Sequence, residues 1–201
     1  RVLTGDLALA LLSSIALESS GGGKIVVPVT ASRIVDIQAK KAGGEVVRVK
    51  VGAKHVLRAV KREGAVFGGE ERGTFSFAEF QVGFDGMFSL LKVMEELSVR
   101  HVTLSQLVDL MPTTYMVKRS LKVPFELRGK VLRTLVERLK EAEIDTIDGV
   151  KILEKSGWIL IHPRPHEPLF DLYVEAESRE AAATMLERYM NLLSKVIGVK
   201  A

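Results

Sequence analysis

The sequence predicts an α/β domain with a mixed, partly parallel sheet and helices, followed by a smaller α+β domain with an antiparallel sheet. Two observations lead to this division. Up to Pro112, helix-like and strand-like segments alternate, which favours an α/β layer with at least part of its sheet parallel. From Thr113 onward a strand, a helix and a strand hairpin follow one another, which is typical of an α+β unit with an antiparallel sheet.

The first part of the chain is predicted to run helix, strand, helix, strand, helix, strand. Its first helix spans the apolar residues 7–17, and Asp6 is expected to cap it. The segments that follow are a strand over 24–29, a helix that Ser32 caps and that ends at Gly43-Gly44, a strand over 45–51, a helix over 53–63 that Gly64 closes, and a very short strand over 65–67.

Two more helices complete this part. Asp85 is placed to cap an amphipathic helix over 87–97, and Thr103 with Gln106 has the spacing of a capping box for a short helix before Pro112. The second part is then expected to comprise a strand over 115–123, a helix over 126–141, a hairpin of strands 150–154 and 158–162 joined by Ser156-Gly157, a strand over 169–176, and a final helix of about 17 residues capped by Ser178.

Length and composition exclude several classes of protein. The 201 residues allow one large or two modest units, and the absence of cysteine excludes disulfides, thiolate metal sites and cysteine nucleophiles. An intracellular, cytoplasmic location is therefore expected. The longest apolar stretch, 7–17, is far shorter than the roughly 20 residues of a membrane span, so we predict a soluble protein. The chain starts with Arg1 and shows no signal peptide, as expected of a fragment or processed form.

The charge balance gives a weaker indication of ligand class. Lys and Arg number 29 against 25 Asp and Glu, and the net charge of +4 favours an anionic ligand without identifying it. Nucleic-acid binders usually gather basic residues in one stripe, whereas residues 130–143 mix both signs as a solvated helix face does. We therefore predict neither a nucleic-acid partner nor a membrane partner.

A glycine-rich segment, residues 68–73 (GGEERG), is the first candidate site. It lies where a short strand ends, and ligands commonly bind at strand ends of α/β sheets. Glycines let backbone amides approach a ligand, and the paired carboxylates of Glu70 and Glu71 can accept hydrogen bonds from the vicinal hydroxyls of a sugar. The alternative is a tight turn whose carboxylates are solvated.

A proline-rich segment, residues 162–168 (HPRPHEP), is the second candidate site. Three prolines in seven residues exclude a helix and predict a stiff loop between two strands. Arg164 with His162 and His166 could clamp a phosphate, because a guanidinium makes bidentate contacts with its oxygens. Two alternatives stay open: the histidines could bind a metal, or the segment could be a rigid connector with its polar groups in water.

Seven segments occur in the order found in one enzyme family. They are LTGDLALALL, VPVTASRIVDIQAKKAGGEVVRVKVG, GAVFGGEERG, FDGMFSLLKVMEEL, VPFELRGKV, IDGVKI and GWILIHPRPHEPLFDLYVEA. On these segments the chain resembles the C-terminal half of an α-D-phosphohexomutase, of the phosphomannomutase and phosphoglucomutase family, and is most similar to archaeal members. The resemblance covers nearly the whole chain. It implies that residues 1–20 are the tail of the family's second domain, 21–112 a sugar-recognition α/β domain, 113–125 a linker and first strand, and 126–201 a C-terminal phosphate-binding domain.

The resemblance also implies an activity. Family enzymes interconvert hexose 1-phosphates and 6-phosphates of mannose or glucose, using a phosphoserine and bound Mg²⁺, and the loops that carry these groups lie upstream of the region matched here. We therefore expect no catalytic residue and no metal ligand in this chain, with hexose phosphates and upstream catalytic domains of the same protein as partners. The oligomeric state stays open. The alternative is a degenerate, non-catalytic module that binds sugar phosphates or another protein.

Both candidate loops depart from the family pattern. In the sugar loop, GEESGH of the family is GEERGT here, so Glu70 matches while Arg72 replaces a serine and Thr74 a histidine. In the phosphate loop, RPSGTEP is HPRPHEP, and the arginine often found a few residues later is Asp171. The resemblance places Glu70, Glu71 and Arg72 at the sugar, and His162, Arg164 and His166 at the phosphate that is not reacting.

Overall fold

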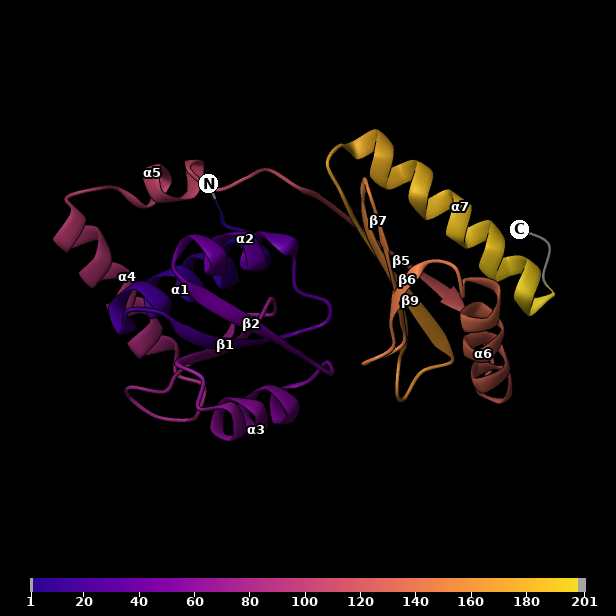
Figure 1. Cartoon of the computed structure of the whole chain (residues 1–201), viewed down its shortest axis with the longest axis horizontal. Helices are drawn as coiled ribbons and strands as arrows, with labels where there is room; N and C mark the ends of the chain where they lie inside the picture. Colours follow the sequence, from indigo (N-terminus) through magenta and orange to yellow (C-terminus); the bar gives the residue numbers. More distant parts are fainter. Residues whose placement is uncertain (1, 199–201) are drawn as a thin grey trace. The chain divides into compact units, whose positions relative to one another are not determined.

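The structure is a computed structural model that describes residues 2–198. The chain divides into two compact units, Arg1–Pro112 and Thr113–Ala201, which are drawn in Figure 1 and described separately below. Each unit has its own sheet and its own buried apolar cluster, so each can be followed from its sequence pattern. Within residues 2–198, no helix has the length and apolar character that a bilayer-spanning segment requires.

The first unit contains a four-stranded mixed sheet. Its elements are α1 (Gly5–Ser20), β1 (Gly23–Pro28), α2 (Arg33–Lys41), β2 (Gly44–Val49), α3 (Ala53–Glu63), β3 (Phe67–Glu70), β4 (Thr74–Phe77), α4 (Gly86–Arg100) and α5 (Leu104–Asp109). The strand order is β2-β1-β3-β4, with β1 parallel to both β2 and β3, and β4 antiparallel to β3. The predicted mixed, partly parallel sheet is confirmed.

Helices cover both faces of this sheet. Successive side chains of β1 point to opposite sides and are apolar, so each face needs a covering layer. Ile25 and Val27 pack in a cluster with α1 and α2, whereas Val26 packs with residues of α3. Figure 1 shows α1 and α2 on one side of β1 and β2, and α3 on the other. A nearly continuous apolar strand is what this arrangement requires, since β1 is buried on both faces.

Most predicted helix caps are confirmed. The side chains of Ser32, Asp85 and Thr103 each accept a hydrogen bond from a backbone amide at the start of the following helix. The prediction for the first helix is wrong, because Thr4 is its N-cap and accepts from the amide of Leu7. Asp6 lies one residue inside that helix, and its carboxylate accepts instead from the backbone amide of Ser32, 3.1 Å away.

The glycine-rich segment is more regular than its composition indicates. The strand predicted over 65–67 is observed as Phe67–Glu70, so it includes two of the glycines, and β4 follows after a short turn. We did not predict β4, since its four residues are too few for an alternating pattern to be distinct. Of the predicted loop 68–73, only residues 71–73 therefore form the hairpin turn, and Gly73 supplies the positive φ of 96° that this turn needs.

The first helix belongs structurally to this unit. The sequence resemblance assigns residues 1–20 to the tail of a preceding domain, whereas α1 contacts α2 and β3 and supplies much of the buried cluster around Leu9 and Leu17. Its apolar run explains this placement, because those side chains leave water only when they pack on the sheet.

The second unit contains a five-stranded antiparallel sheet in the order β5-β9-β8-β7-β6. Its elements are β5 (Tyr115–Lys122), a 3₁₀ turn (Phe125–Leu127), α6 (Arg128–Arg138), β6 (Glu143–Asp145), β7 (Val150–Glu154), β8 (Gly157–Pro163), β9 (Leu169–Ala176) and α7 (Arg179–Ile197). The predicted antiparallel sheet is confirmed. The helix predicted over 126–141 is shorter than expected, and the three-residue β6, which we did not predict, follows it.

The two faces of this sheet differ in character. Phe170, Leu172 and Val174 of β9 pack in one apolar cluster with residues of α6 and α7, and Figure 1 shows both helices on the same side of the sheet. The alternate residues Asp171 and Tyr173 therefore point to the opposite face. Asp171 is only 3% exposed, so this second face carries buried polar groups that need hydrogen-bond partners.

Candidate functional site

Three strand ends of the first unit meet at one edge of its sheet. Thr30 follows β1, Gly52 follows β2, and Glu70 with Glu71 lies at the end of β3, and these three strands run parallel. The carboxyl ends of parallel strands are where ligands bind in α/β sheets. The structure therefore places the residues predicted to bind sugar at the edge where a ligand site is expected.

Glu70 is occupied by contacts within the protein. It is the last residue of β3 and is 6% exposed. Its Oε1 accepts from the backbone amide of Gly52 at 3.1 Å, and its Oε2 accepts from the Thr74 hydroxyl at 3.1 Å. Each oxygen thus has a donor already, so Glu70 joins the end of β3 to the start of α3 and to β4.

Glu71 has one carboxylate oxygen without a hydrogen-bond donor. Its Oε1 accepts from the Thr30 hydroxyl at 3.0 Å, while its Oε2 is buried and has no hydrogen-bond partner among residues 2–198. A buried acceptor without a donor is unfavourable by roughly 1–3 kcal/mol. Arg72 follows at the exposed tip of the turn. Between Glu70 and Glu71, only Glu71 therefore keeps a carboxylate oxygen without a donor among residues 2–198.

The start of α1 fixes the position of this turn. A Cβ placed on Gly5 would lie 1.6 Å from the carbonyl oxygen of Glu71, so the helix backbone passes directly against the turn. Only glycine permits such an approach, because any other residue would require one of the two backbones to move. Glu71 is thus held at two points, its carboxylate by the Thr30 hydroxyl and its backbone by the first turn of α1.

In the second unit, the proline-rich segment is partly strand and partly loop. His162 belongs to β8, is 6% exposed, and has its Nε2 3.1 Å from Oδ2 of Asp148. His162 thus lies in the strand predicted over 158–162, and because β8 continues as far as Pro163, the loop is shorter than the segment 162–168. Arg164 and His166 do lie in the loop, and His166 is exposed there.

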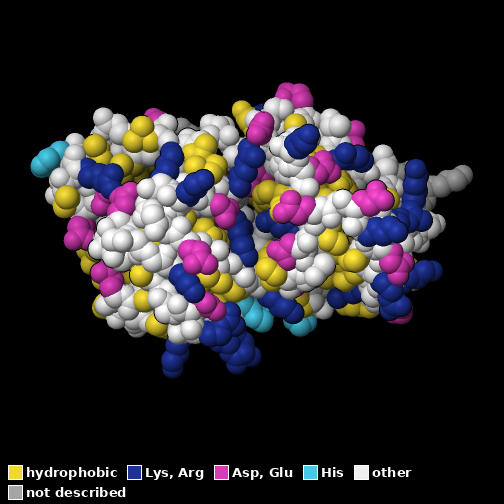
Figure 2. Space-filling model, viewed as in Figure 1, with side chains coloured by type: hydrophobic (Ala, Val, Ile, Leu, Met, Phe, Trp, Pro, Cys, Tyr) yellow, Lys and Arg dark blue, Asp and Glu magenta, His cyan; other side chains and the backbone are white. Residues whose placement is uncertain are grey.

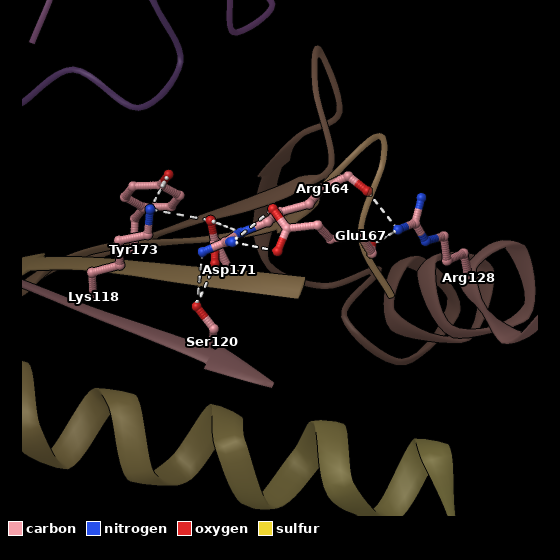
Figure 3. A network of polar contacts seen from close by, with 7 residues as sticks. All are labelled: Lys118, Ser120, Arg128, Arg164, Glu167, Asp171 and Tyr173. Atoms are coloured by element: carbon pink, nitrogen blue, oxygen red, sulfur yellow. Dashed lines mark hydrogen bonds and ion pairs between the residues drawn. The ribbon is translucent and has the colours of Figure 1, made fainter. Parts of the chain in front are cut away.

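Arg164 is surrounded by acceptors (Figure 3). Its Nε donates to Oδ2 of Asp171 at 2.9 Å, its Nη1 donates to both carboxylate oxygens of Glu167 at 3.0 Å, and its Nη2 donates to the Ser120 hydroxyl at 3.3 Å. The residue that replaces the family's later arginine, Asp171, is therefore the direct partner of Arg164.

Asp171 is the centre of this network. Lys118 Nζ lies 3.1 Å from its Oδ2, and the Ser120 hydroxyl donates to its Oδ1 at 2.6 Å. Burial alone would raise the pKa of Asp171, but the hydrogen bonds from Arg164, Ser120 and Lys118 outweigh it and hold this pKa below its usual range. Asp171 is therefore ionised at neutral pH and fixes the guanidinium of Arg164.

Arg128, at the start of α6, holds the loop backbone in place. Its guanidinium donates to the carbonyl oxygens of Arg164, Pro165 and Glu167, and it lies 4.2 Å from the centre of the Phe125 ring. A planar group with five donors is suited to several carbonyls at once. Sequence reasoning did not find this residue, because the loop carbonyls that it binds are more than thirty positions away in the sequence.

The lowered pKa of Asp171 predicts a pH dependence of stability. A carboxyl with a depressed folded pKa contributes stability that is present above its unfolded pKa, about 3.9, and is lost as pH falls through the folded value. We expect the stability difference between the wild type and Asp171→Asn to shrink as pH falls below about 4. Urea unfolding followed by fluorescence of Trp158, the single tryptophan, measures it. A difference that stays constant from pH 7 to pH 2 would contradict the assignment.

The described residues do not fit a metal centre. Across residues 2–198, no cluster of three or more His, Asp or Glu side chains is placed to hold an ion. His162 of β8, one of the two histidines considered as metal ligands, has its Nε2 next to the carboxylate of Asp148. Residues 2–198 therefore hold no group of side chains that fits a Mg²⁺ site.

Comparisons with known proteins identify the family. A mixed α/β unit followed by an antiparallel α+β unit is the arrangement of the last two domains of phosphohexomutases. Residues 4–115 match the family model described as phosphoglucomutase/phosphomannomutase, alpha/beta/alpha domain III. A probable phosphoglucosamine mutase of Methanopyrus kandleri is 38% identical over 194 residues, which are 96% of this chain and 43% of that protein. The chain belongs to the phosphoglucomutase/phosphomannomutase family and spans less than half the length of that relative.

Solved structures share the fold of the whole chain. A phosphoglucomutase/phosphomannomutase family protein from Burkholderia thailandensis superposes with a TM-score of 0.83 at 24% identity, covering 98% of this chain and 42% of that one. N-acetylphosphoglucosamine mutase of Aspergillus fumigatus, in complex with GlcNAc-6P and magnesium, gives a TM-score of 0.64 at 16% identity, with 98% and 47% covered. The family resemblance and the fold class predicted from sequence are confirmed.

Proposed function

We propose that this chain is the sugar- and phosphate-recognising part of an enzyme that interconverts hexose 1-phosphates and hexose 6-phosphates. One observation supports it above the others: the buried Oε2 of Glu71, without a donor, lies at the carboxyl ends of the parallel strands β1, β2 and β3, where ligands bind in α/β sheets. A sugar hydroxyl or amino group would supply the missing donor. Glu70 and Arg72 complete the proposed sugar face, with Glu70 holding the turn and Arg72 at its exposed tip.

The substrate class follows from what Glu71 can accept and from the names of the relatives. A carboxylate accepts from a hydroxyl and accepts more strongly from an ammonium group. The relative from Methanopyrus kandleri is named a probable phosphoglucosamine mutase, and the Aspergillus enzyme binds GlcNAc-6P. We therefore infer a hexose phosphate as substrate, with glucosamine, glucose and mannose phosphates as the candidates.

We propose that the loop after β8, in the second unit, binds the substrate phosphate that does not take part in the reaction. Arg164 and His166 lie in that loop, and His162 lies beneath it in β8. A guanidinium and an imidazole there would hold the phosphate in place while the sugar reorients, which lowers the entropic part of the barrier. Charges of both signs are interspersed over the face seen in Figure 2, in keeping with a small anionic ligand rather than a nucleic acid.

Phosphoryl transfer itself requires groups beyond those described. In such reactions Mg²⁺ neutralises developing charge on the phosphoryl oxygens, and a nucleophile accepts the group. We propose that both belong to further domains of the same protein, because the relative is more than twice as long as the matched region. By this proposal the chain binds and orients substrate, does not catalyse transfer alone, and acts in the cytoplasm.

A second candidate is a non-catalytic module that has lost phosphate binding. One observation favours it: the guanidinium of Arg164 already has carboxylate partners in Asp171 and Glu167. This candidate predicts that hexose phosphates do not perturb the loop at all. Binding measurements therefore distinguish the two candidates.

Replacing Glu71 with alanine tests the sugar assignment. Removing a charged hydrogen-bond acceptor is expected to weaken hexose phosphate binding by about 1.5–3 kcal/mol, roughly 10- to 150-fold. Isothermal titration of the full chain with glucosamine 6-phosphate and glucose 6-phosphate measures the change. The matched control is Glu45→Ala, which removes an exposed carboxylate on β2 of the same unit. Equal affinities for Glu71→Ala and Glu45→Ala would refute the assignment.

A further inference from the structure

The two carboxylates that contact Arg164 differ in how firmly they are held. The side chain of Asp171 is 4% exposed and also contacts Lys118 and Ser120. The side chain of Glu167 is 54% exposed, and it meets Arg164 at a single nitrogen, Nη1. Figure 3 shows the guanidinium of Arg164 joined by dashed lines to the carboxylates of both Asp171 and Glu167. Asp171 is therefore a fixed partner, and Glu167 is an exchangeable one.

The free energies of these contacts support the distinction. An exposed ion pair contributes about 0–1 kcal/mol, because water solvates both ions when they separate and holding two side chains together loses entropy. A buried carboxylate that loses its cation is far less stable. Glu167 can therefore leave Arg164 at small cost, whereas Asp171 keeps its contact with Nε.

The loop backbone restricts how Glu167 can leave. Arg128 binds the carbonyl oxygens of Arg164, Pro165 and Glu167, and the amide of Arg164 donates to the carbonyl of Leu169 at 2.9 Å. These contacts hold the main chain, so rotation of the Glu167 side chain is enough to free Nη1. No opening of the loop is needed.

We propose that Glu167 occupies the anion position on Arg164, and that a substrate phosphate binds there only by displacing this carboxylate. Two phosphate oxygens would take the place of the two carboxylate oxygens now 3.0 Å from Nη1. Glu167 thereby lowers the affinity of the loop for phosphate and is an affinity-determining residue. The inference rests on the proposed function only in assigning this anion to the substrate.

The test compares phosphate binding to the full chain with and without this charge. Inorganic phosphate and glucose 6-phosphate are titrated into the wild type and Glu167→Gln, and binding is followed by ¹⁵N shifts of loop amides and of the Arg164 Nε–H. Losing an exposed competing ion pair is expected to tighten phosphate binding about two- to five-fold. The matched control is Glu187→Gln, which removes an exposed charge on α7, and its affinity should equal that of the wild type.

The outcomes separate this inference from the proposed function. Tighter binding by Glu167→Gln that disappears in the double variant with Arg164→Ala supports the inference, even if the wild type binds too weakly to measure. Wild-type binding that Glu167→Gln leaves unchanged overturns the inference and leaves the proposed function intact. A gain that persists without Arg164 also overturns it, because the effect would then be one of net charge. Silence in every variant overturns both.

Discussion

Replacing Phe170 with alanine is expected to lower the free energy of unfolding of the second unit by about 3–5 kcal/mol, the range for deleting a buried phenyl ring. Phe170 is fully buried in the apolar cluster between β9 and the two helices, and it pairs with Leu121 and Pro163 in the sheet register. Its loss leaves a cavity on the helix-covered face of β9, the face opposite to the one that carries Asp171. The fluorescence of Trp158, which lies in the same sheet, reports unfolding in guanidinium chloride.

A control for Phe170→Ala is available in the other unit. Phe80 is 56% exposed, so Phe80→Ala should leave the Trp158 transition where it is. If Phe170→Ala lowered the free energy of unfolding by less than about 1 kcal/mol, the core of the second unit would differ from the one described.

Replacing Gly5 with alanine is expected to destabilise the first unit by about 3 kcal/mol, at the upper end of the range for overpacking. The added Cβ would meet the Glu71 carbonyl oxygen at 1.6 Å, and that atom is backbone, so either α1 or the β3–β4 turn must shift. Because the same turn carries Glu71, the residue proposed to bind the sugar, the variant should also weaken hexose phosphate binding. Hydrogen exchange at the amides of β1 and β3 measures the stability.

Gly86→Ala provides the comparison for Gly5→Ala. Gly86 is also the first residue of a helix in this unit, but a Cβ there meets no atom within 4 Å. Alanine at this position should be neutral or slightly stabilising, because it reduces the freedom of the unfolded chain. If the amides of β1 and β3 were equally protected from hydrogen exchange in both variants, the close approach of α1 to the turn would be refuted.

Much of the fold could be predicted from local sequence patterns. The strand over 169–176 was predicted with the bounds observed for β9, and Ser32, Asp85, Thr103 and Ser178 cap the helices predicted for them. Caps and alternation act over a few residues, so one sequence is enough to reveal them. The strands β4 and β6 were not predicted, because segments of three or four residues form through their pairing partners rather than through a pattern of their own.

The candidate site shows the limit of local reasoning more clearly. Glycines and prolines correctly indicated both turns, and the paired carboxylates indicated hydrogen-bond acceptors. The sequence did not reveal that Thr30 occupies one oxygen of Glu71, or that Gly52 and Thr74 occupy both oxygens of Glu70. Nor did it reveal the contacts of Arg128. All except the Thr74 contact join residues that only the tertiary fold brings together.

The most direct test of hexose phosphate recognition is amide chemical-shift mapping of the full labelled chain. It is titrated separately with glucosamine 6-phosphate, glucose 1-phosphate, mannose 1-phosphate, inorganic phosphate and glucose. We predict that the phosphosugars shift the amides of Thr30 and residues 69–74, together with those of Arg164, His166 and Glu167, and that glucose alone does not shift the second group. No shift in either group at tens of millimolar phosphosugar would contradict the assignment of both loops.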